Sequence, residues 1–125
     1  MEQSARKKIL GLVGLGIRGR RAVVGVQQVR DGARRGKVKL ALVAGDASKN
    51  SMDKVVPLLT ARGVAMLEGF SAGELGAACG REAVSVVGVV DAGLARGMRE
   101  AAPDAVKSVG DAGASPTVRN QGGRF

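Results

Sequence analysis

Residues 36–48, GKVKLALVAGDAS, contain the segment that decides the fold. Positions 39–45 form an apolar run that ends in Gly-Asp, which is typical of a strand buried at the centre of a sheet. Before this run, residues 26–33 have an apolar stripe at helical spacing. After it, residues 52–62 again show a helical pattern, which stops at a glycine. A buried strand between two helices predicts an α/β fold.

The alternation of helices and strands continues toward both ends of the chain. A glycine-rich helix is predicted over residues 4–20, strands over 21–24, 64–67 and 83–90, and helices over 71–79 and from Asp91 to about Glu100. Ser71 and Glu74 have the spacing of a capping box, and Pro57 predicts a kink or a break in its helix. The complete order predicts a three-layer α/β/α sandwich around a four-stranded mixed sheet.

A length of 125 residues suits one domain. We expect this domain to span residues 1–102, because residues 103–125 are rich in Ala, Gly, Ser and Pro and predict a disordered or loosely packed tail. The apolar run at residues 9–17 is too short to cross a bilayer, which needs about 20 residues, and arginines close it without a cleavage site. We therefore expect a cytoplasmic protein without a membrane partner.

The composition excludes several kinds of site. The chain has no His, Trp or Tyr, two Phe and a single Cys. It therefore lacks the usual general base, the usual zinc ligands, an internal disulfide and the aromatic platforms on which bases stack. Cys79 lies among small residues and is expected in the core. Asp46 and Glu74 stand where they would cap helices, so we expect no enzyme, no metal and no cofactor.

Positive charge is concentrated in the first part of the chain. The net charge is +9, with 20 basic and 11 acidic side chains. Residues 1–50 contain twelve of the basic and three of the acidic side chains, whereas residues 51–125 contain eight of each. Such asymmetry predicts a basic surface that binds a polyanion, most simply nucleic acid.

A glycine cluster near the start of the chain offers an alternative function. Gly14, Gly16 and Gly19 match the G-x-G-x-x-G pattern of dinucleotide-binding folds. In those folds a strand precedes the glycines, which let the backbone approach a pyrophosphate. This interpretation, a small Rossmann-like nucleotide-binding domain, requires residues 8–13 to form a strand, whereas binding of RNA by the chain requires them to lie in a helix.

A second candidate segment begins at Gly25, where the chain passes from a strand into a helix. Backbone N–H groups at such a turn can hold a phosphate, and the amides of Gln27 and Gln28 can donate and accept hydrogen bonds at base edges. The basic candidates for phosphate contacts in this segment are Arg30, Arg34, Arg35, Lys37 and Lys39. An exposed helix face without a ligand is the other interpretation of the same spacing.

The segments Gly25-Val-Gln-Gln, Gly36-Lys-Val-Lys-Leu, Gly45-Asp-Ala-Ser and Glu74-Leu-Gly-Ala-Ala-Cys-Gly follow one another along the chain. In this order they resemble the kink-turn RNA-binding family of ribosomal proteins, of the archaeal L7Ae and eukaryotic L30e type, and most closely its bacterial YlxQ-like subgroup. The resemblance covers residues 6 to about 100. It implies an α/β/α sandwich that binds structured RNA in a ribonucleoprotein, in association with the ribosome or translation, as a monomer with no small-molecule substrate.

The resemblance also implies which residues contact the RNA. Family members use the helix start, here Gly25, Gln27 and Gln28, to contact the sheared G·A pairs of a kink-turn. A loop after the Leu-Gly-x-x-x-Gly helix packs against a flipped-out nucleotide, and its residues here are Gly80, Arg81, Glu82, Ala83 and Val84. Asp31 stands where the family has a Lys. We expect Gln27, Gln28, Arg30 and this loop to lie at one edge of the domain.

Overall fold

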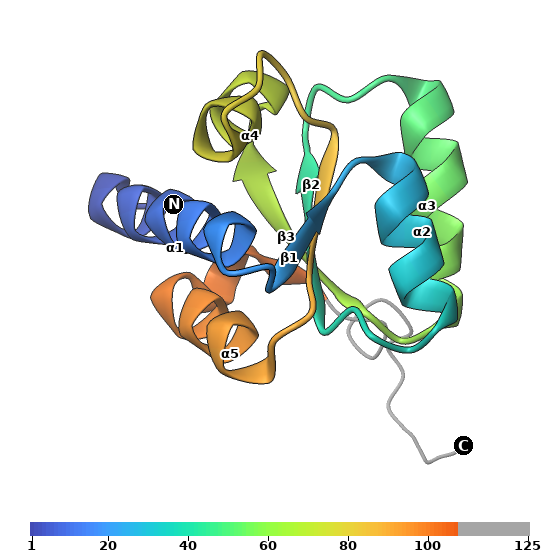
Figure 1. The fold of residues 1–125 in the computed structure, drawn as a ribbon. Helices are drawn as coiled ribbons and strands as arrows, with labels where there is room; N and C mark the ends of the chain where they lie inside the picture. Colours follow the sequence, from blue (N-terminus) through green and yellow to red (C-terminus); the bar gives the residue numbers. More distant parts are fainter. Residues whose placement is uncertain (108–125) are drawn as a thin grey trace.

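The computed structural model describes residues 1–107, which form a five-stranded mixed sheet flanked by five α-helices (Figure 1). The helices are α1 (Gln3–Arg18), α2 (Val26–Arg34), α3 (Lys49–Ala61), α4 (Ala72–Cys79) and α5 (Ala92–Ala101), followed by the 3-10 helix η1 (Pro103–Ala105). The strands are β1 (Ala22–Val24), β2 (Leu40–Ala44), β3 (Ala65–Phe70), β4 (Val86–Val89) and β5 (Val106–Lys107). The predicted α/β order is therefore confirmed, and residues 108–125 of the predicted tail lie outside the described residues.

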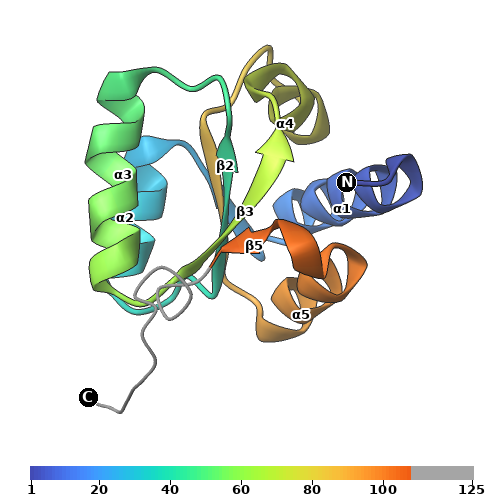
Figure 2. The ribbon, with the colours of Figure 1, turned by 180° about the vertical axis from the view of Figure 1, so that it is seen from behind.

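The sheet has the strand order β1-β4-β2-β3-β5. β2 and β3 run parallel, and the other neighbouring strands run antiparallel, which makes the sheet mixed. The prediction of four strands is wrong, because Val106 and Lys107 pair with Leu67 and Met66 and add β5 beside β3 (Figure 2). A strand of two residues is too short to show a periodic pattern, so its position depends on the exposed side of β3 rather than on local sequence.

Helices cover both faces of the sheet, with α1, α4 and α5 on one face and α2 and α3 on the other (Figure 1). All five residues of β2 are buried, as expected for a central strand. Leu40, Leu42 and Ala44 point into the core beneath α1, α4 and α5, whereas Ala41 and Val43 point into the core beneath α2 and α3. The apolar run therefore serves both cores, because successive side chains of a strand point to opposite faces.

Helix α3 continues through Pro57, so the predicted break in this helix is wrong. A proline inside a helix has no N–H to donate and therefore removes one hydrogen bond of the helix. Val55 and Leu59 are both buried against the sheet on either side of Pro57, which is itself exposed. Packing of these two side chains holds both parts of α3 on the sheet and outweighs the local cost of the proline.

Candidate nucleic-acid interface

The candidate site lies at the upper end of the sheet in Figure 1, where β1, β2 and β3 end and β4 begins. Three backbone hydrogen bonds join these strand ends. The N–H of Gly25 donates to the carbonyl of Val86 at 2.9 Å, and the N–H of Ala44 donates to Ser85 at 2.9 Å. The N–H of Gly45 donates to Phe70, also at 2.9 Å. Segments far apart in the sequence therefore meet at the upper end.

Gly25 forms the turn from β1 into α2. Its φ of 97° lies in the left-handed region, which favours glycine over other residues. No side chain caps the first turn of α2. In contrast, Ser48 caps α3 and Ser71 caps α4, and both of these helices begin at the same end of the sheet. The N–H groups of the first turn of α2 are thus free of a side-chain partner at the point where a phosphate or base can approach.

The residue at the N-cap position distinguishes the start of α2 from the other helix starts already in the sequence. Three of the predicted helices have Ser or Asp at the N-cap position, namely Ser48, Ser71 and Asp91, whose side chains accept a hydrogen bond from the first turn. Only α2 among these four helices has a glycine there. A missing cap at an otherwise well-capped end of the sheet indicates that an external group can take the cap's place.

Gln27 and Gln28 lie on the first turn of α2 and are both exposed. The Nε2 amide of Gln27 donates to Oδ1 of Asp31 at 3.0 Å, which leaves the amide oxygen of Gln27 available as an acceptor. Asp31 also faces Arg34, with Nη1 of Arg34 and Oδ1 of Asp31 separated by 3.7 Å. A row of polar contacts therefore follows the exposed side of α2, with the carboxylate of Asp31 at its centre.

The loop from Gly80 to Val84 reaches the same end of the sheet. It packs directly on α4, where a Cβ added to Gly76 would lie 2.7 Å from Cα of Ala83. The N–H of Arg81 donates to Gly76 at 2.7 Å, and the N–H of Val84 donates to Ala72 at 2.9 Å. These contacts hold the loop in place immediately before Ser85 and Val86, which are joined to β2 and to Gly25. The structure thus brings this loop and the start of α2 together.

Members of the loop differ in exposure. Gly80, Arg81, Glu82 and Ala83 are exposed, so their surface is open to a ligand. Val84 is 5 % exposed and belongs to the core beneath α1 and α4. Its side chain supports the loop from below rather than contacting a ligand.

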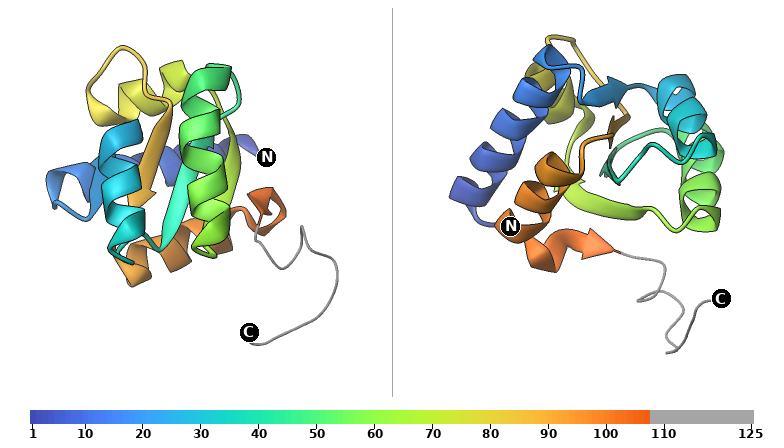
Figure 3. Two further views of the ribbon diagram at one scale, coloured as in Figure 1. Left: turned by 90° about the vertical axis from the view of Figure 1, so that its right-hand side faces the viewer. Right: turned by 60° about the horizontal axis from the view of Figure 1, so that its bottom comes forward.

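The basic side chains expected along α2 do not gather at the upper end. The guanidinium of Arg30 donates to the backbone carbonyl of Lys54, which lies on α3, the helix beside α2 (Figure 3, left). Arg34 lies in the last turn of α2, and Lys37 follows α2 in the turn that leads to β2. Both are therefore close to the lower end of the sheet, about 13 Å away along the nine-residue helix.

Carboxylates at the upper end are engaged in structural contacts. Oδ1 of Asp46 accepts from the N–H of Ala72 at 2.7 Å, and Glu74 completes the predicted capping box with Ser71. Glu74 also binds the guanidinium of Arg6 at 3.1 Å. The backbone N–H of Ser71, followed by the charge of Arg6, holds the pKa of Glu74 below its usual value. Glu74 is therefore ionised at neutral pH and fixes α1 to α4 beneath the loop.

Cys79 packs against the core beneath α1 and α4, as predicted. Burial raises the pKa of the Cys79 thiol, and the nearby charge of Arg81 acts in the opposite direction without cancelling this effect. The thiol is therefore protonated at neutral pH and is a poor nucleophile, because the thiolate is the reactive form.

The nucleotide-binding interpretation of the first glycine cluster is wrong. Residues 8–13 lie in α1, not in a strand, and Gly14 and Gly16 are buried in the middle of that helix. A Cβ at Gly16 would lie 2.8 Å from Cδ2 of Leu94 and 3.2 Å from Cβ of Ala22. Gly16 therefore allows α1 to pack closely on α5 and β1, and Gly14 faces the backbone of α4. Neither glycine is at a helix N-terminus where a pyrophosphate binds.

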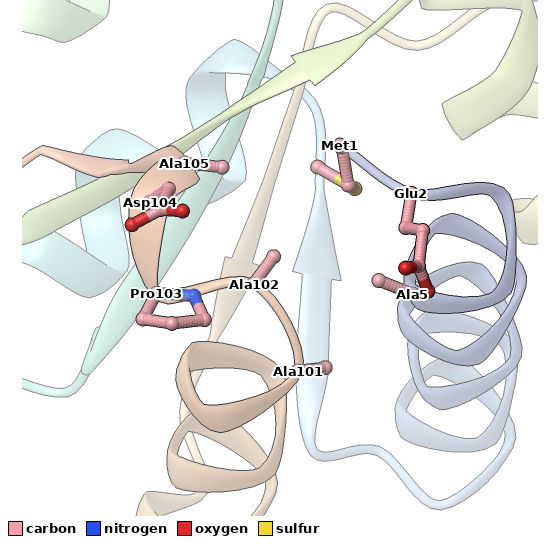
Figure 4. Close-up of a pocket in the computed structure, with 8 residues that line it drawn as sticks. All are labelled: Met1, Glu2, Ala5, Ala101, Ala102, Pro103, Asp104 and Ala105. Atoms are coloured by element: carbon pink, nitrogen blue, oxygen red, sulfur yellow. The ribbon is translucent and has the colours of Figure 1, made fainter.

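A pocket of about 540 Å³ lies beside η1 (Figure 4). It is formed between the start of α1 and the segment 101–105. Its two charged side chains, Glu2 and Asp104, are both acidic, so it is unsuited to a phosphate-bearing ligand.

Within residues 1–107, no helix is both long enough and apolar enough to cross a membrane.

Comparisons with known proteins give a family and several relatives for this chain. The model of the ribosomal protein L7Ae/L30e/S12e/Gadd45 family matches residues 7–99. RNA-binding protein YlxQ of Enterococcus faecium is 32% identical over 100 residues, which cover 80% of this chain and 96% of that protein.

Two solved structures are similar as a whole. A protein of unknown function from Bacillus halodurans has a TM-score of 0.69 and 29% identity, covering 75% of this chain and 95% of that one. A 15.5kD RNA binding protein of Giardia lamblia has a TM-score of 0.67 and covers 84% of this chain and 90% of its own. At 21% identity, the second likeness shows the fold alone.

Proposed function

This chain belongs to the ribosomal protein L7Ae/L30e/S12e/Gadd45 family, and on that basis we propose that it is a non-catalytic RNA-binding protein. The name of its relative YlxQ supports RNA as the ligand. We further propose that the RNA is structured and kink-turn-like, and that the protein acts as a monomer in a ribosomal or translation-associated ribonucleoprotein, without a cofactor or small-molecule substrate.

One observation carries this proposal: the uncapped start of α2 lies beside the exposed loop of residues 80–83 at the upper end of the sheet. Gln27, Gln28 and residues 80–83 are exposed, and backbone hydrogen bonds join Gly25 to Val86 and Ala44 to Ser85 next to them. A preformed surface of this kind suits RNA recognition, in which the shape of the RNA and its unstacked bases provide specificity.

Each part of this surface has a proposed role. N–H groups after Gly25 donate hydrogen bonds to a phosphate or a base oxygen, and the positive end of the α2 dipole lies at these groups. The amides of Gln27 and Gln28 hydrogen-bond to base edges of the paired region. Residues 80–83 provide an exposed surface against which an extruded nucleotide packs. Arg81 adds a positive charge close to the phosphate of this nucleotide.

Substitution of the two glutamines tests this assignment. We expect Gln27→Ala and Gln28→Ala each to weaken binding to a kink-turn RNA by about 1–3 kcal/mol, because each loses hydrogen bonds to a base edge. Salt dependence should stay unchanged, since neither side chain is charged. The measurement is a fluorescence-anisotropy titration, and the matched control is Gln3→Ala, an exposed glutamine at the start of α1.

A second RNA distinguishes base recognition from general affinity. In this RNA the sheared G·A pairs are replaced by Watson–Crick pairs, so that only the kink-turn geometry is lost. We expect the wild-type protein to prefer the kink-turn RNA and both variants to lose most of that preference. Equal affinity of the wild-type protein for both RNAs would show that the upper end does not recognise a kink-turn.

A further inference from the structure

The lower end of the sheet, opposite the candidate RNA site, brings separate basic segments together. The N–H of Lys39 donates to the carbonyl of Val89 at 2.7 Å, and the N–H of Val90 donates to the carbonyl of Arg21 at 2.8 Å. The end of β4 therefore lies between the segment that precedes β1 and the segment that precedes β2. Arg20 and Arg21 come from the first, and Lys37 and Lys39 come from the second.

Helix α5 lies at this end of the sheet (Figure 3, left) and contains two further arginines, Arg96 and Arg99. Nη2 of Arg99 donates to the backbone carbonyl of Lys39 at 3.2 Å. Arg96 lies three residues earlier and therefore on the same side of the helix. Arg96, Arg99 and Lys39, together with Ala92 and Ala95, line a surface pocket of about 360 Å³.

We call the group formed by these side chains the basic patch: Arg20, Arg21, Lys37, Lys39, Arg96 and Arg99. All six residues are exposed. Within residues 1–107, none of them forms an ion pair, whereas Arg6 and Lys49, which lie toward the upper end, are paired with Glu74 and Asp53.

Two acidic groups lie near the patch along the chain: Glu100, which follows Arg99 and forms no ion pair within residues 1–107, and Asp91, which is already engaged. Oδ2 of Asp91 accepts from the N–H of Leu94 at 2.8 Å and caps α5. Six positive charges without acidic partners repel one another, and this repulsion lowers the stability of the folded chain. An anionic ligand that spans the patch would remove that cost.

The backbone of Arg20 gives independent support. Its φ is 60°, and among the non-glycine residues that the structure describes it alone has a positive φ. A residue with a side chain is disfavoured there, so glycine would suit the turn between α1 and β1 better. Strained positions of this kind often occur where the side chain itself is used. Arg20 directly precedes Arg21, whose carbonyl accepts from the N–H of Val90 at the end of β4.

We propose that the basic patch is a second RNA-contact surface, which binds the phosphate backbone of an RNA segment other than the one held at the upper end. The inference rests on the proposed function, because that function identifies the polyanion as RNA. Its chemistry is different: the upper end presents amides and a helix start, whereas the patch presents only cations. One molecule would therefore hold two segments of a folded RNA on opposite sides of its sheet.

Neutralising part of the patch tests the proposal. The variant Lys37→Gln/Lys39→Gln/Arg96→Gln removes three charges and avoids Arg99, whose side chain binds the backbone. The control Lys7→Gln/Lys8→Gln/Lys54→Gln removes the same charge from exposed positions on α1 and α3. Affinity for an extended kink-turn RNA is measured as a function of salt concentration by fluorescence anisotropy.

In the patch variant we expect the plot of log K against log salt to become shallower by about 2–3, because each phosphate contact contributes about 0.7–0.9 to the slope. The preference for the kink-turn RNA over its Watson–Crick counterpart should remain, since the upper end is unchanged. A slope equal to that of the control variant would overturn the second surface while leaving the proposed function intact. Absence of any RNA binding by the wild-type protein would overturn both.

A single substitution gives a check that does not depend on a loss of stability. Arg20→Gly relieves the left-handed backbone, so it should raise the midpoint of thermal unfolding, yet it should lower RNA affinity at low salt. Higher stability with unchanged affinity would exclude Arg20 from the surface. The wild-type protein could instead bind phosphatidylserine vesicles, and the patch variant could lose this binding while its affinity for RNA stays unchanged. That result would assign the patch to a membrane surface and overturn the proposal.

Discussion

At the scale of single residues, Gly76 explains why a helix with the pattern Leu-Gly-x-x-x-Gly precedes the loop of the candidate site. A Cβ at this position would lie 2.7 Å from both Cα and N of Ala83 and 2.8 Å from the carbonyl carbon of Glu82. The obstacle is backbone rather than the end of a flexible side chain, so the loop itself would have to move. The glycine therefore places residues 82–83 against α4.

Alanine at this position should destabilise the protein. We expect Gly76→Ala to lower the free energy of unfolding by about 1–3 kcal/mol, the usual cost of overpacking, despite the higher helix propensity of alanine. The control is Gly11→Ala in the middle of α1, where a Cβ meets nothing within 4 Å. That change should instead stabilise by about 0.5–1 kcal/mol. Urea unfolding of both variants measures the difference.

If Gly76→Ala lowers the free energy of unfolding and Gly11→Ala raises it, close backbone packing is the reason for a glycine at position 76. If both substitutions stabilise the protein, the loop yields without cost and the packing argument is wrong. The affinity of the Gly76→Ala variant for a kink-turn RNA gives a second measurement. We expect this affinity to fall even when the variant is fully folded, because the loop is displaced.

At the scale of secondary-structure elements, α2 carries an acidic group at the centre of its exposed side. Asp31 accepts from Gln27 and pairs with Arg34, so one carboxylate restrains both a proposed base-contacting side chain and a proposed phosphate-contacting one. It also places a negative charge next to the expected path of an RNA backbone. Under the proposed function, we expect Asp31 to weaken the binding of RNA to α2.

Replacing this carboxylate should strengthen RNA binding. We expect Asp31→Asn to raise affinity severalfold at low salt and to steepen the salt dependence by up to about 0.7–0.9, the contribution of one phosphate contact made by the released Arg34. Glu68→Gln is the control, because Glu68 on β3 pairs with Lys107 at 3.3 Å away from α2. Fluorescence anisotropy compares the three proteins, and an equal gain in both variants would attribute the effect to net charge alone.

Local patterns were sufficient to predict most of the elements. The apolar run of β2, the capping box of Ser71 and the N-cap of Asp91 are properties of a few neighbouring residues, and each is found as predicted. The predictions are wrong where tertiary contacts, rather than local patterns, determine the secondary structure. Packing of α3 on the sheet overrides the helix-breaking effect of Pro57, and the free side of β3 recruits β5 from a segment that has no strand pattern of its own.

The candidate site follows the same division. The residues themselves indicated the segment at Gly25, whereas the resemblance to the family indicated the loop of residues 80–84. The structure brings the two segments together through Gly25 and Val86. The contacts of their charged side chains could not be identified in this way. Arg30 reaches a carbonyl of α3 that lies 24 residues away, and this pairing depends on how α2 and α3 pack.

At the scale of the whole molecule, basic side chains that form no ion pair within residues 1–107 gather at the lower end of the sheet. The first 50 residues contain twelve basic side chains, which suggests a single basic segment. In the folded chain four of the six patch residues come from this part, and α5 supplies Arg96 and Arg99 to the same end of the sheet. The upper end, with the exposed amides of Gln27 and Gln28, thus differs chemically from the lower end, and this difference underlies the proposal of two RNA-contact surfaces.

The extent of the folded unit leads to a final prediction, which compares a chain that ends at Lys107 with one that ends at Ala102. The shorter chain lacks η1 and β5, so β3 loses its antiparallel partner and presents unpaired backbone groups at the side of the sheet. We expect the free energy of unfolding to be about 1–3 kcal/mol lower for the shorter chain, because it loses the β5 hydrogen bonds and the packing of Ala105 and Val106 on the core. Urea unfolding measures this difference, and size-exclusion chromatography shows whether the exposed strand promotes association. Equal stability and equal elution of the two chains would place the boundary of the domain at residue 102 and make β5 dispensable.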